Sequence, residues 1–321
     1  MTRTRAFLPR VGLPDRDLGS LPSALGRFPD GAHFRIEIPS TEGPACLEAV
    51  IGEADRLDVP IHRVSQGSGV SMLTDAELDS MSELGRRAGI EVSLFARPNA
   101  AWVNSAMARS PAGVVAAPTA HGTEGLVAVM EDVLRAADHG IRSVLIADIG
   151  ALDLFREMRA AGELPADMQA KVSVMLPAAN PAAARVLATL GASTINVPTD
   201  LSLAQLAAIR AATDVPLDVY VESPDDLGGF VRLAEIAEIV RVTAPVYVKF
   251  GLRNAPNLYP AGAHLEAVAV ACSRERVRRA RIGLDLLAGD RSLVISSRGA
   301  EGLALPRVNH AVADRSAAIS S

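Results

Sequence analysis

The sequence predicts a single-domain (β/α)₈ barrel, and three observations support this fold class. From residue 33 the chain repeats one unit, a short β-branched run followed by a polar turn and a helix rich in Ala, Leu and Glu. Strands that alternate with helices form parallel sheets, and eight units favour closure of the sheet into a barrel. No GxGxxG motif follows the first run, which disfavours an open dinucleotide-binding sheet.

The strands are expected to be short, and each is followed by a helical pattern. Their predicted ranges are 33–38, 61–66, 91–97, 143–148, 171–176, 193–198, 217–222 and 246–251. Thr74 with Glu77 three residues later has the pattern of a capping box. Ser202 and Ser273 are expected to cap helices in the same way. Three glycines stand where helices should end in the left-handed conformation: Gly89, Gly140 and Gly191.

The barrel is expected to span residues 33–290, with an N-terminal extension at 1–32 and a C-terminal tail at 291–321. One connection, residues 98–122, is much longer than the others and contains Trp102. Connections of this length in a compact domain are commonly functional lids, or else disordered. We therefore expect it to cover the end of the barrel where the strands terminate.

Composition excludes several classes of protein. The net charge of -5 and the pI of 5.7 argue against a nucleic-acid partner. The two cysteines, Cys46 and Cys272, are too few and too far apart for an iron–sulfur cluster or a zinc ribbon, and we expect no nucleotide cofactor. The chain has no long apolar run and no apolar segment at its start, so we expect a cytoplasmic protein without a membrane partner. Short Ala-rich helices are consistent with a homo-oligomer.

Polar residues at the carboxyl ends of the predicted strands suggest an enzyme site, because barrel enzymes work at that face. Side-chain alternation places Tyr220 and Glu222 on one face of their strand, and Lys249 on the corresponding face of the next. We therefore predict an inward-pointing pair of Glu222 and Lys249, because a buried lysine needs an acidic neighbour. With Asp148, these two residues are the predicted catalytic groups.

A second set of residues is expected to bind the substrate. Arginines from three strand ends, at positions 63, 97 and 253, favour an anionic or carbonyl-rich small molecule. The predicted substrate-binding residues are Arg63, Gln66, Arg97, Asn196, Tyr220, Arg253 and Asn254. As an alternative, a divalent metal such as Mg²⁺ could bind through Glu37, Asp148 and Glu222.

Several segments resemble peptidase family U32, the collagenase-like peptidases. They are VKFGLRNAPNLYP at 248–260, GAHLEAVAVACSRERVRRARIGL at 262–284, INVPTDLSLAQLAAIR at 195–210 and PLDVYVESPDDLGGFVR at 216–232. The resemblance extends over residues 33–288 and implies a barrel fold and a hydrolase. The cysteine signature near a Glu-x-Phe sequence that better-known members carry is absent. The chain therefore resembles a divergent, barrel-only branch, and no catalytic residue is transferred from that signature.

These observations predict an enzyme that acts on a small polar, anionic substrate at the carboxyl end of the barrel. Hydrolysis is the reaction that the family resemblance implies. A lyase or aldolase reaction through Lys249 as an amine nucleophile, or through a bound metal, is the main alternative. A non-catalytic barrel that serves as a scaffold or subunit is a further alternative.

Overall fold

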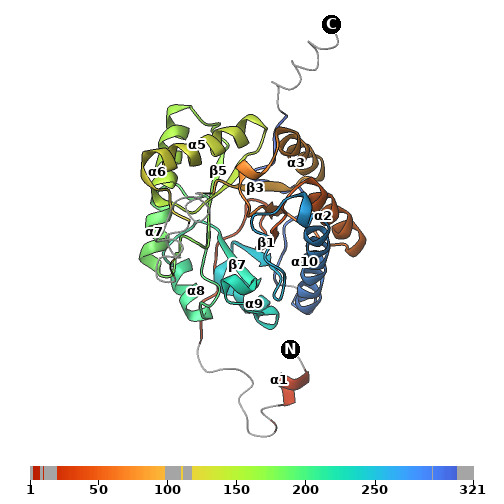
Figure 1. Ribbon diagram of the computed structural model, residues 1–321. Helices are drawn as coiled ribbons and strands as arrows, with labels where there is room; N and C mark the ends of the chain where they lie inside the picture. Colours follow the sequence, from red (N-terminus) through yellow and green to blue (C-terminus); the bar gives the residue numbers. More distant parts are fainter. Residues whose placement is uncertain are drawn as a thin grey trace.

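The chain folds as a closed barrel of eight parallel strands in sequential order, β1 to β8, with β8 pairing with β1. The computed structural model describes residues 3–7, 10, 20–97, 110, 118–290 and 292–308. Figure 1, a view along the barrel axis, shows helices surrounding the ring of strands. The predicted (β/α)₈ barrel is therefore confirmed.

The strands are short and the helices between them vary in length. The strands are β1 Phe34–Pro39, β2 Arg63–Ser65, β3 Glu91–Phe95, β4 Ser143–Ile146, β5 Gln169–Val172, β6 Thr194–Asn196, β7 Leu217–Glu222 and β8 Val246–Phe250. The α-helices are α1 Arg3–Phe7, α2 Pro44–Leu57, α3 Asp75–Ala88, α5 Gly122–Asp138, α6 Ile149–Ala161, α7 Pro181–Thr189, α8 Leu203–Arg210, α9 Ile236–Thr243 and α10 Glu266–Leu287. None of the helices in this part of the chain is long and apolar enough to cross a membrane.

All eight strands overlap the predicted ranges, and β5 deviates most. It begins at Gln169 and ends at Val172, whereas the prediction was 171–176. The chain turns at Ser173, whose hydroxyl accepts a hydrogen bond from the Met175 amide at 3.2 Å and whose carbonyl accepts one from the Leu176 amide. The difference in bounds places Lys171 next to the last residue of β5 instead of at its start.

Most of the predicted helix ends are confirmed. Thr74 and Glu77 form the predicted capping box, and Ser202 forms another. Gly89, Gly140 and Gly191 all have positive φ at the ends of helices. The prediction for Ser273 is wrong, because it lies inside α10 and its hydroxyl donates to the Ala269 carbonyl instead of capping a helix.

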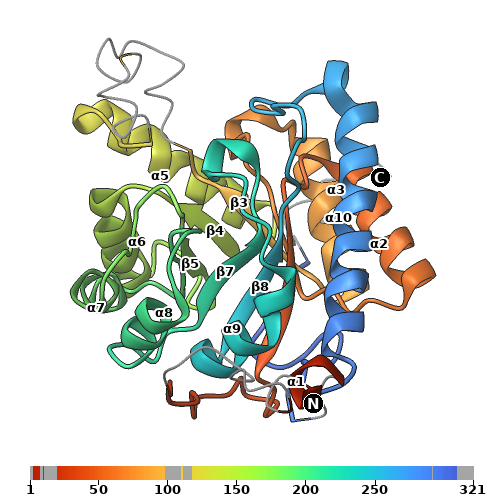
Figure 2. The ribbon, with the colours of Figure 1, turned by 90° about the horizontal axis from the view of Figure 1, so that it is seen from below.

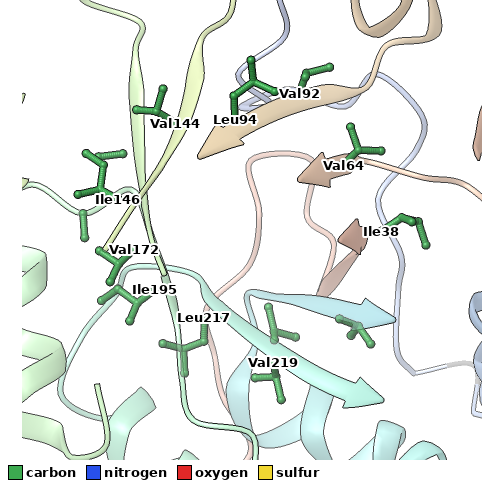
Figure 3. Packing of buried hydrophobic residues seen from close by; sticks show 14 of the residues in the cluster. Ile38, Val64, Val92, Leu94, Val144, Ile146, Val172, Ile195, Leu217 and Val219 are labelled. Carbon is green, nitrogen blue, oxygen red and sulfur yellow. The ribbon is translucent and has the colours of Figure 1, made fainter. Parts of the chain in front are cut away.

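The main hydrophobic core lies between the strands and the helices. Figure 3 shows residues such as Val64, Leu94 and Val219 on the outer side of the strands, directed away from the barrel axis. The inward positions are largely polar or charged and are nonetheless buried. Barrel interiors are usually filled by branched apolar residues, so this polar interior is an unusual feature that needs a reason.

The amino end of the barrel is closed by two segments that flank the strands in sequence. Residues 20–33 precede β1 and lie below the barrel in Figure 2. Residues 292–308 return to the same end, where Ile295 forms a parallel bridge with Phe34 and the Arg307 amide donates to the Gly140 carbonyl. The carboxyl end is the opposite face, at which the predicted site should lie.

His62 links β1 to the C-terminal segment through both of its ring nitrogens, and these two hydrogen bonds require one neutral tautomer. Its Nδ1 accepts the Ile36 amide at 2.9 Å, so its Nε2 carries the proton and donates to the Ser296 carbonyl at 2.9 Å. A proton on Nδ1 would oppose the Ile36 N–H. Burial, the largest influence, lowers the pKa of His62 to about 4.

This histidine should make the fold sensitive to acid. Because the folded pKa of His62 is about 4 and the unfolded one is 6.5, the unfolded chain binds more protons between these values. Stability should therefore fall as pH falls from 7 to 4, by about 3 kcal/mol from this group. In urea titrations, the native chain should have a higher free energy of unfolding than His62→Gln at pH 7, and this difference should be smaller at pH 4 by the same amount. An advantage that does not change with pH would contradict the assignment.

Candidate active site

The centre of the barrel is occupied by a network of buried charges around Glu37 of β1. One carboxylate oxygen accepts hydrogen bonds from Ser65 Oγ at 2.7 Å and from Lys171 Nζ, and it lies 3.0 Å from Lys249 Nζ. The other oxygen accepts from Arg63 Nε at 2.8 Å. Glu37 has no exposed surface. A single carboxylate thus holds three cations from β2, β5 and β8.

Arg63 connects this carboxylate to the far side of the barrel. It donates to Asp218 of β7 at 2.5 Å and to Thr194 Oγ1 of β6 at 3.2 Å. Its guanidinium stacks over the ring of Tyr247, 3.6 Å from the ring centre. Buried charges are tolerated when they are paired and hydrogen-bonded in this way. We call Glu37, Arg63, Lys171, Asp218 and Lys249 the central network.

The two lysines of the network are the only lysines in the sequence. Lysine and arginine together number 32, so the remaining 30 basic residues are arginines. Lys171 and Lys249 are 1% and 2% exposed, and both contact the same oxygen of Glu37. Arg63, a larger cation, is accommodated in the same interior. The chain thus places both of its lysines in this interior and uses arginine at every other basic position.

The shared carboxylate gives the two amines opposite properties. Burial would raise the pKa of Glu37, but Arg63, Lys171 and Lys249 outweigh it and hold that pKa well below the ordinary value. Burial, followed by repulsion from Arg63, lowers the pKa of Lys171 to about 7. Burial also acts on Lys249, but the charge of Glu37 overcomes it, and the pKa of Lys249 is raised. Near neutral pH, a partly neutral amine therefore stands beside a protonated one.

The carboxyl-end side of the network combines polar and apolar surfaces. Lys249 donates to Asn196 Oδ1 at 2.6 Å and lies 4.4 Å from the centre of the Tyr220 ring. Across the barrel, a separate apolar cluster lies on β3, on β4 and on the chain that follows β4 and β5. It consists of Phe95, Leu145 and Ala147, with Met175 packed against them. The network therefore has a polar side around Lys249 and an apolar cluster across the barrel from it.

The predicted pairing of Glu222 with Lys249 is wrong. A register irregularity lies between Tyr220 and Glu222, so Glu222 pairs with Phe250 and alternation fails there. Its carboxylate accepts the Arg253 amide at 3.0 Å and lies 3.4 Å from Arg279 Nε of α10. Glu37 is the acidic partner of Lys249 instead.

Asp148 also lies outside the network, because it caps α6. Its carboxylate accepts the Ala151 amide at 2.8 Å and the Ala120 amide at 2.9 Å. Among the described residues, no group of three or more His, Cys, Asp or Glu is placed to hold a metal ion. The grouping of Glu37, Asp148 and Glu222 as metal ligands is therefore wrong in its geometry.

The predicted convergence of three arginines is also wrong. Arg63 is in the barrel interior, whereas Arg97 donates to the Gly67 carbonyl at 2.8 Å and Arg253 has 60% of its side chain exposed. Gln66 uses its amide to hold its own turn, through the Gly69 amide and carbonyl.

Asn254 is exposed in the loop after β8 and adopts positive φ. Its amide donates to Asp225 at 2.5 Å. Of the predicted residues, the structure brings together Lys249, Arg63, Asn196, Tyr220 and Glu37.

Sequence reasoning missed Lys171 and did not place Asp218 in the site. Lys171 was taken as the first residue of its strand, at the end remote from the expected active face. A count of lysines was the available signal, because two lysines among 32 basic residues stand out without any structure. The predicted lid at 98–122 falls largely outside the described residues, which include only 110 and 118–122 of it.

One family model matches part of the chain, and solved structures are similar to it in fold. The model for peptidase family U32 matches residues 98–223. No curated protein matches the chain. The U32 peptidase Mk0906 is 17% identical, with 64% of this chain and 73% of that chain covered and a TM-score of 0.36.

Two further solved structures are similar over more of the chain. A protein from Coccidioides immitis that is assigned as a fructose-1,6-biphosphate aldolase is 15% identical, with 81% of this chain and 93% of that chain covered and a TM-score of 0.50. An oxaloacetate acetylhydrolase is 12% identical, with coverages of 90% and 92% and a TM-score of 0.46. At these identities the likeness concerns the fold alone. The family match covers β4 to β7, a shorter range than the resemblance at 33–288.

Proposed function

We propose that the protein is a lyase of the aldolase type, in which the Lys171 amine forms an imine with a small carbonyl substrate. The observation that carries this proposal is the placement of the chain's two lysines on one buried carboxylate. A lysine acts as a nucleophile when its pKa is depressed in a desolvated site next to other cations. Lys171 fits this description, because its pKa is about 7 beside Arg63 and Lys249.

The rest of the network supplies the groups that imine formation needs. The nitrogen of Lys171 attacks the carbonyl carbon and forms a C–N bond. Lys249 donates the proton with which the carbonyl oxygen leaves as water, and it regains a proton in the reverse step. Glu37 offsets the positive charge of the protonated imine. The carbon–carbon bond one atom further out then breaks: a hydroxyl on the departing carbon gives its proton to the now neutral Lys249 and becomes a carbonyl, and the electron pair of the bond forms an enamine. The enamine carbon takes this proton back from Lys249, and water hydrolyses the resulting protonated imine, which releases the second product, restores the Lys171 amine and returns a proton to Lys249.

The surroundings of the two amines favour a small, polar carbonyl compound. Asn196 and Tyr220 lie on the side of Lys249, and Phe95 and Leu145 form an apolar surface across the barrel. Arg97 reaches the Gly67 carbonyl at the carboxyl end of the barrel and could meet a carboxylate or phosphate on the substrate. We therefore place 2-oxo acids and short hydroxyaldehydes or hydroxyketones in the substrate class.

Borohydride trapping tests this function directly. The chain is incubated with pyruvate, oxaloacetate, 2-oxoglutarate, glyceraldehyde or dihydroxyacetone phosphate and then reduced. We expect one stable adduct, located at Lys171 by peptide mass mapping. The sequence offers just two lysine amines besides its α-amino group, so non-specific labelling is easily recognised. No adduct across the panel, or labelling of the α-amino group alone, would refute the imine.

Hydrolysis is the second candidate, because residues 98–223 match a family named for peptidases. In this case the Glu37–Lys249 pair would move protons without a covalent intermediate. Cleavage of peptide substrates by the native chain, lost in Lys249→Met and accompanied by no borohydride adduct, would favour this function over the lyase.

A further inference from the structure

A polar cavity lies at the amino end of the barrel, on the opposite side of the central network from the proposed site. Its volume is about 470 Å³. Its walls are formed by residues 28–29, by the starts of strands and by the C-terminal residues 302–305 and 307. This volume falls within the range typical of pockets for small molecules.

The cavity is lined by more positive than negative charge. Arg35 is 1% exposed, and its three hydrogen-bond partners, Ser296 Oγ, Tyr247 OH and the Glu301 carbonyl, are all uncharged. No carboxylate in the described residues lies within ion-pair distance of it. A buried guanidinium without a direct counter-ion favours an anion in the adjoining space.

Two more arginines line the same cavity. Arg159 donates to the Met168 carbonyl at 2.8 Å and has no acidic partner among the described residues. Arg307 donates to Asp167 at 2.9 Å, but Asp167 also lies 3.0 Å from Arg142. The one carboxylate in the lining is therefore shared by two arginines, and the cavity keeps a surplus of positive charge.

Uncharged residues of the lining define the rest of the ligand. The side-chain amide of Gln169 forms no hydrogen bond within the described protein and is free to bind a ligand. Phe28, Tyr247 and Leu303 supply aromatic and aliphatic surface. A ligand that satisfies both parts has an anionic group and a flat or apolar body.

We infer that this cavity binds a small organic anion, a carboxylate or phosphate attached to an apolar body, at the end of the barrel remote from the proposed active site. Residues 302–305 and 307 form one wall, so the ligand would hold the C-terminal segment against the barrel. Thr194 lines the cavity and also bonds Arg63 and Asp218 of the central network. A ligand bound in this cavity would therefore act on the central network through Thr194, from the amino end of the barrel.

Calorimetric titration with phenyl phosphate and phenylacetate, at constant ionic strength, tests the inference. We expect saturable binding of at least one of them, and the preferred probe distinguishes a phosphate site from a carboxylate site. The Arg159→Gln, Arg307→Gln double variant should lose at least tenfold in affinity. Arg185→Gln, an exposed change on α7 that does not line the cavity, should bind like the native chain.

Three results would overturn the inference. They are no saturable binding of either anion, equal binding of the neutral analogue phenylacetamide, and equal loss of affinity in the Arg185→Gln control. The double variant leaves Lys171, Lys249 and Glu37 unchanged, so its borohydride adduct reports separately on the proposed lyase. The failure of one proposal is thereby distinguishable from the failure of the other.

Discussion

Replacement of Glu37 by Gln should lower the free energy of unfolding by about 3–5 kcal/mol, the usual effect of removing one partner from a buried ion pair. The neutral amide leaves Arg63, Lys171 and Lys249 facing one another inside the barrel, with Asp218 as the nearest remaining acid. Glu37 has no exposed surface, so bulk water does not solvate the cations that this change leaves without their carboxylate. Urea titration followed by circular dichroism measures the loss.

A control and a compensating change make this result specific. Glu83→Gln removes an exposed carboxylate that pairs with Arg86 and Arg87, and it should cost no more than about 1 kcal/mol. Adding Lys171→Met to Glu37→Gln removes one of the unpaired cations and should recover part of the stability. It also provides a folded sample if the single variant does not fold. Equal losses for Glu37→Gln and Glu83→Gln, or an additive double variant, would show that the network is not coupled.

The fold was predictable because each level of the sequence indicates the same barrel. Apolar residues alternate along the strands, glycines end the helices and Thr74 begins one of them, so local and global signals agree. Ser273 was misread because a serine inside a long helix can bond the carbonyl four residues earlier. A serine among polar neighbours is typical of a helix start, and only the length of α10 shows that Ser273 lies inside a helix.

The site was predictable where alternation held along a strand. Arg63, Asn196, Tyr220 and Lys249 all reach the interior in accordance with their parity. Glu222 does not, because the irregularity before it shifts its side chain toward Arg279 of α10. A bulge of this kind leaves no mark in the sequence of β7, so the acidic partner of Lys249 was assigned to the wrong strand.

Hydrogen bonds to nearby backbone groups explain why two other predicted site residues do not face the site. Asp148 and Gln66 stand at strand ends, as catalytic residues do, but their polar atoms are taken by nearby backbone groups. Whether an Asp caps a helix or faces a substrate depends on the path of the loop, which periodicity does not specify. The register of β5 is a similar case. A two-residue error at its start concealed the fact that Lys171 lies next to the strand's last residue.

The second large effect expected concerns the two lysines, which serve as matched controls for each other. Lys171→Met should abolish the borohydride adduct, because it removes the nitrogen that forms the imine. Lys249→Met should retain the adduct but form it about 10²–10⁴-fold more slowly, the usual contribution of a positioned proton donor. In the native chain the rate should rise as pH passes about 7, because the folded pKa of Lys171 lies there and the neutral amine is the nucleophile. Each variant leaves Glu37 paired with Arg63 and with the other lysine, so both should fold. An adduct that persists in Lys171→Met and disappears in Lys249→Met would exchange the two roles, and it would mean that the charge of Glu37 stabilises the protonated form of Lys171 in preference to that of Lys249.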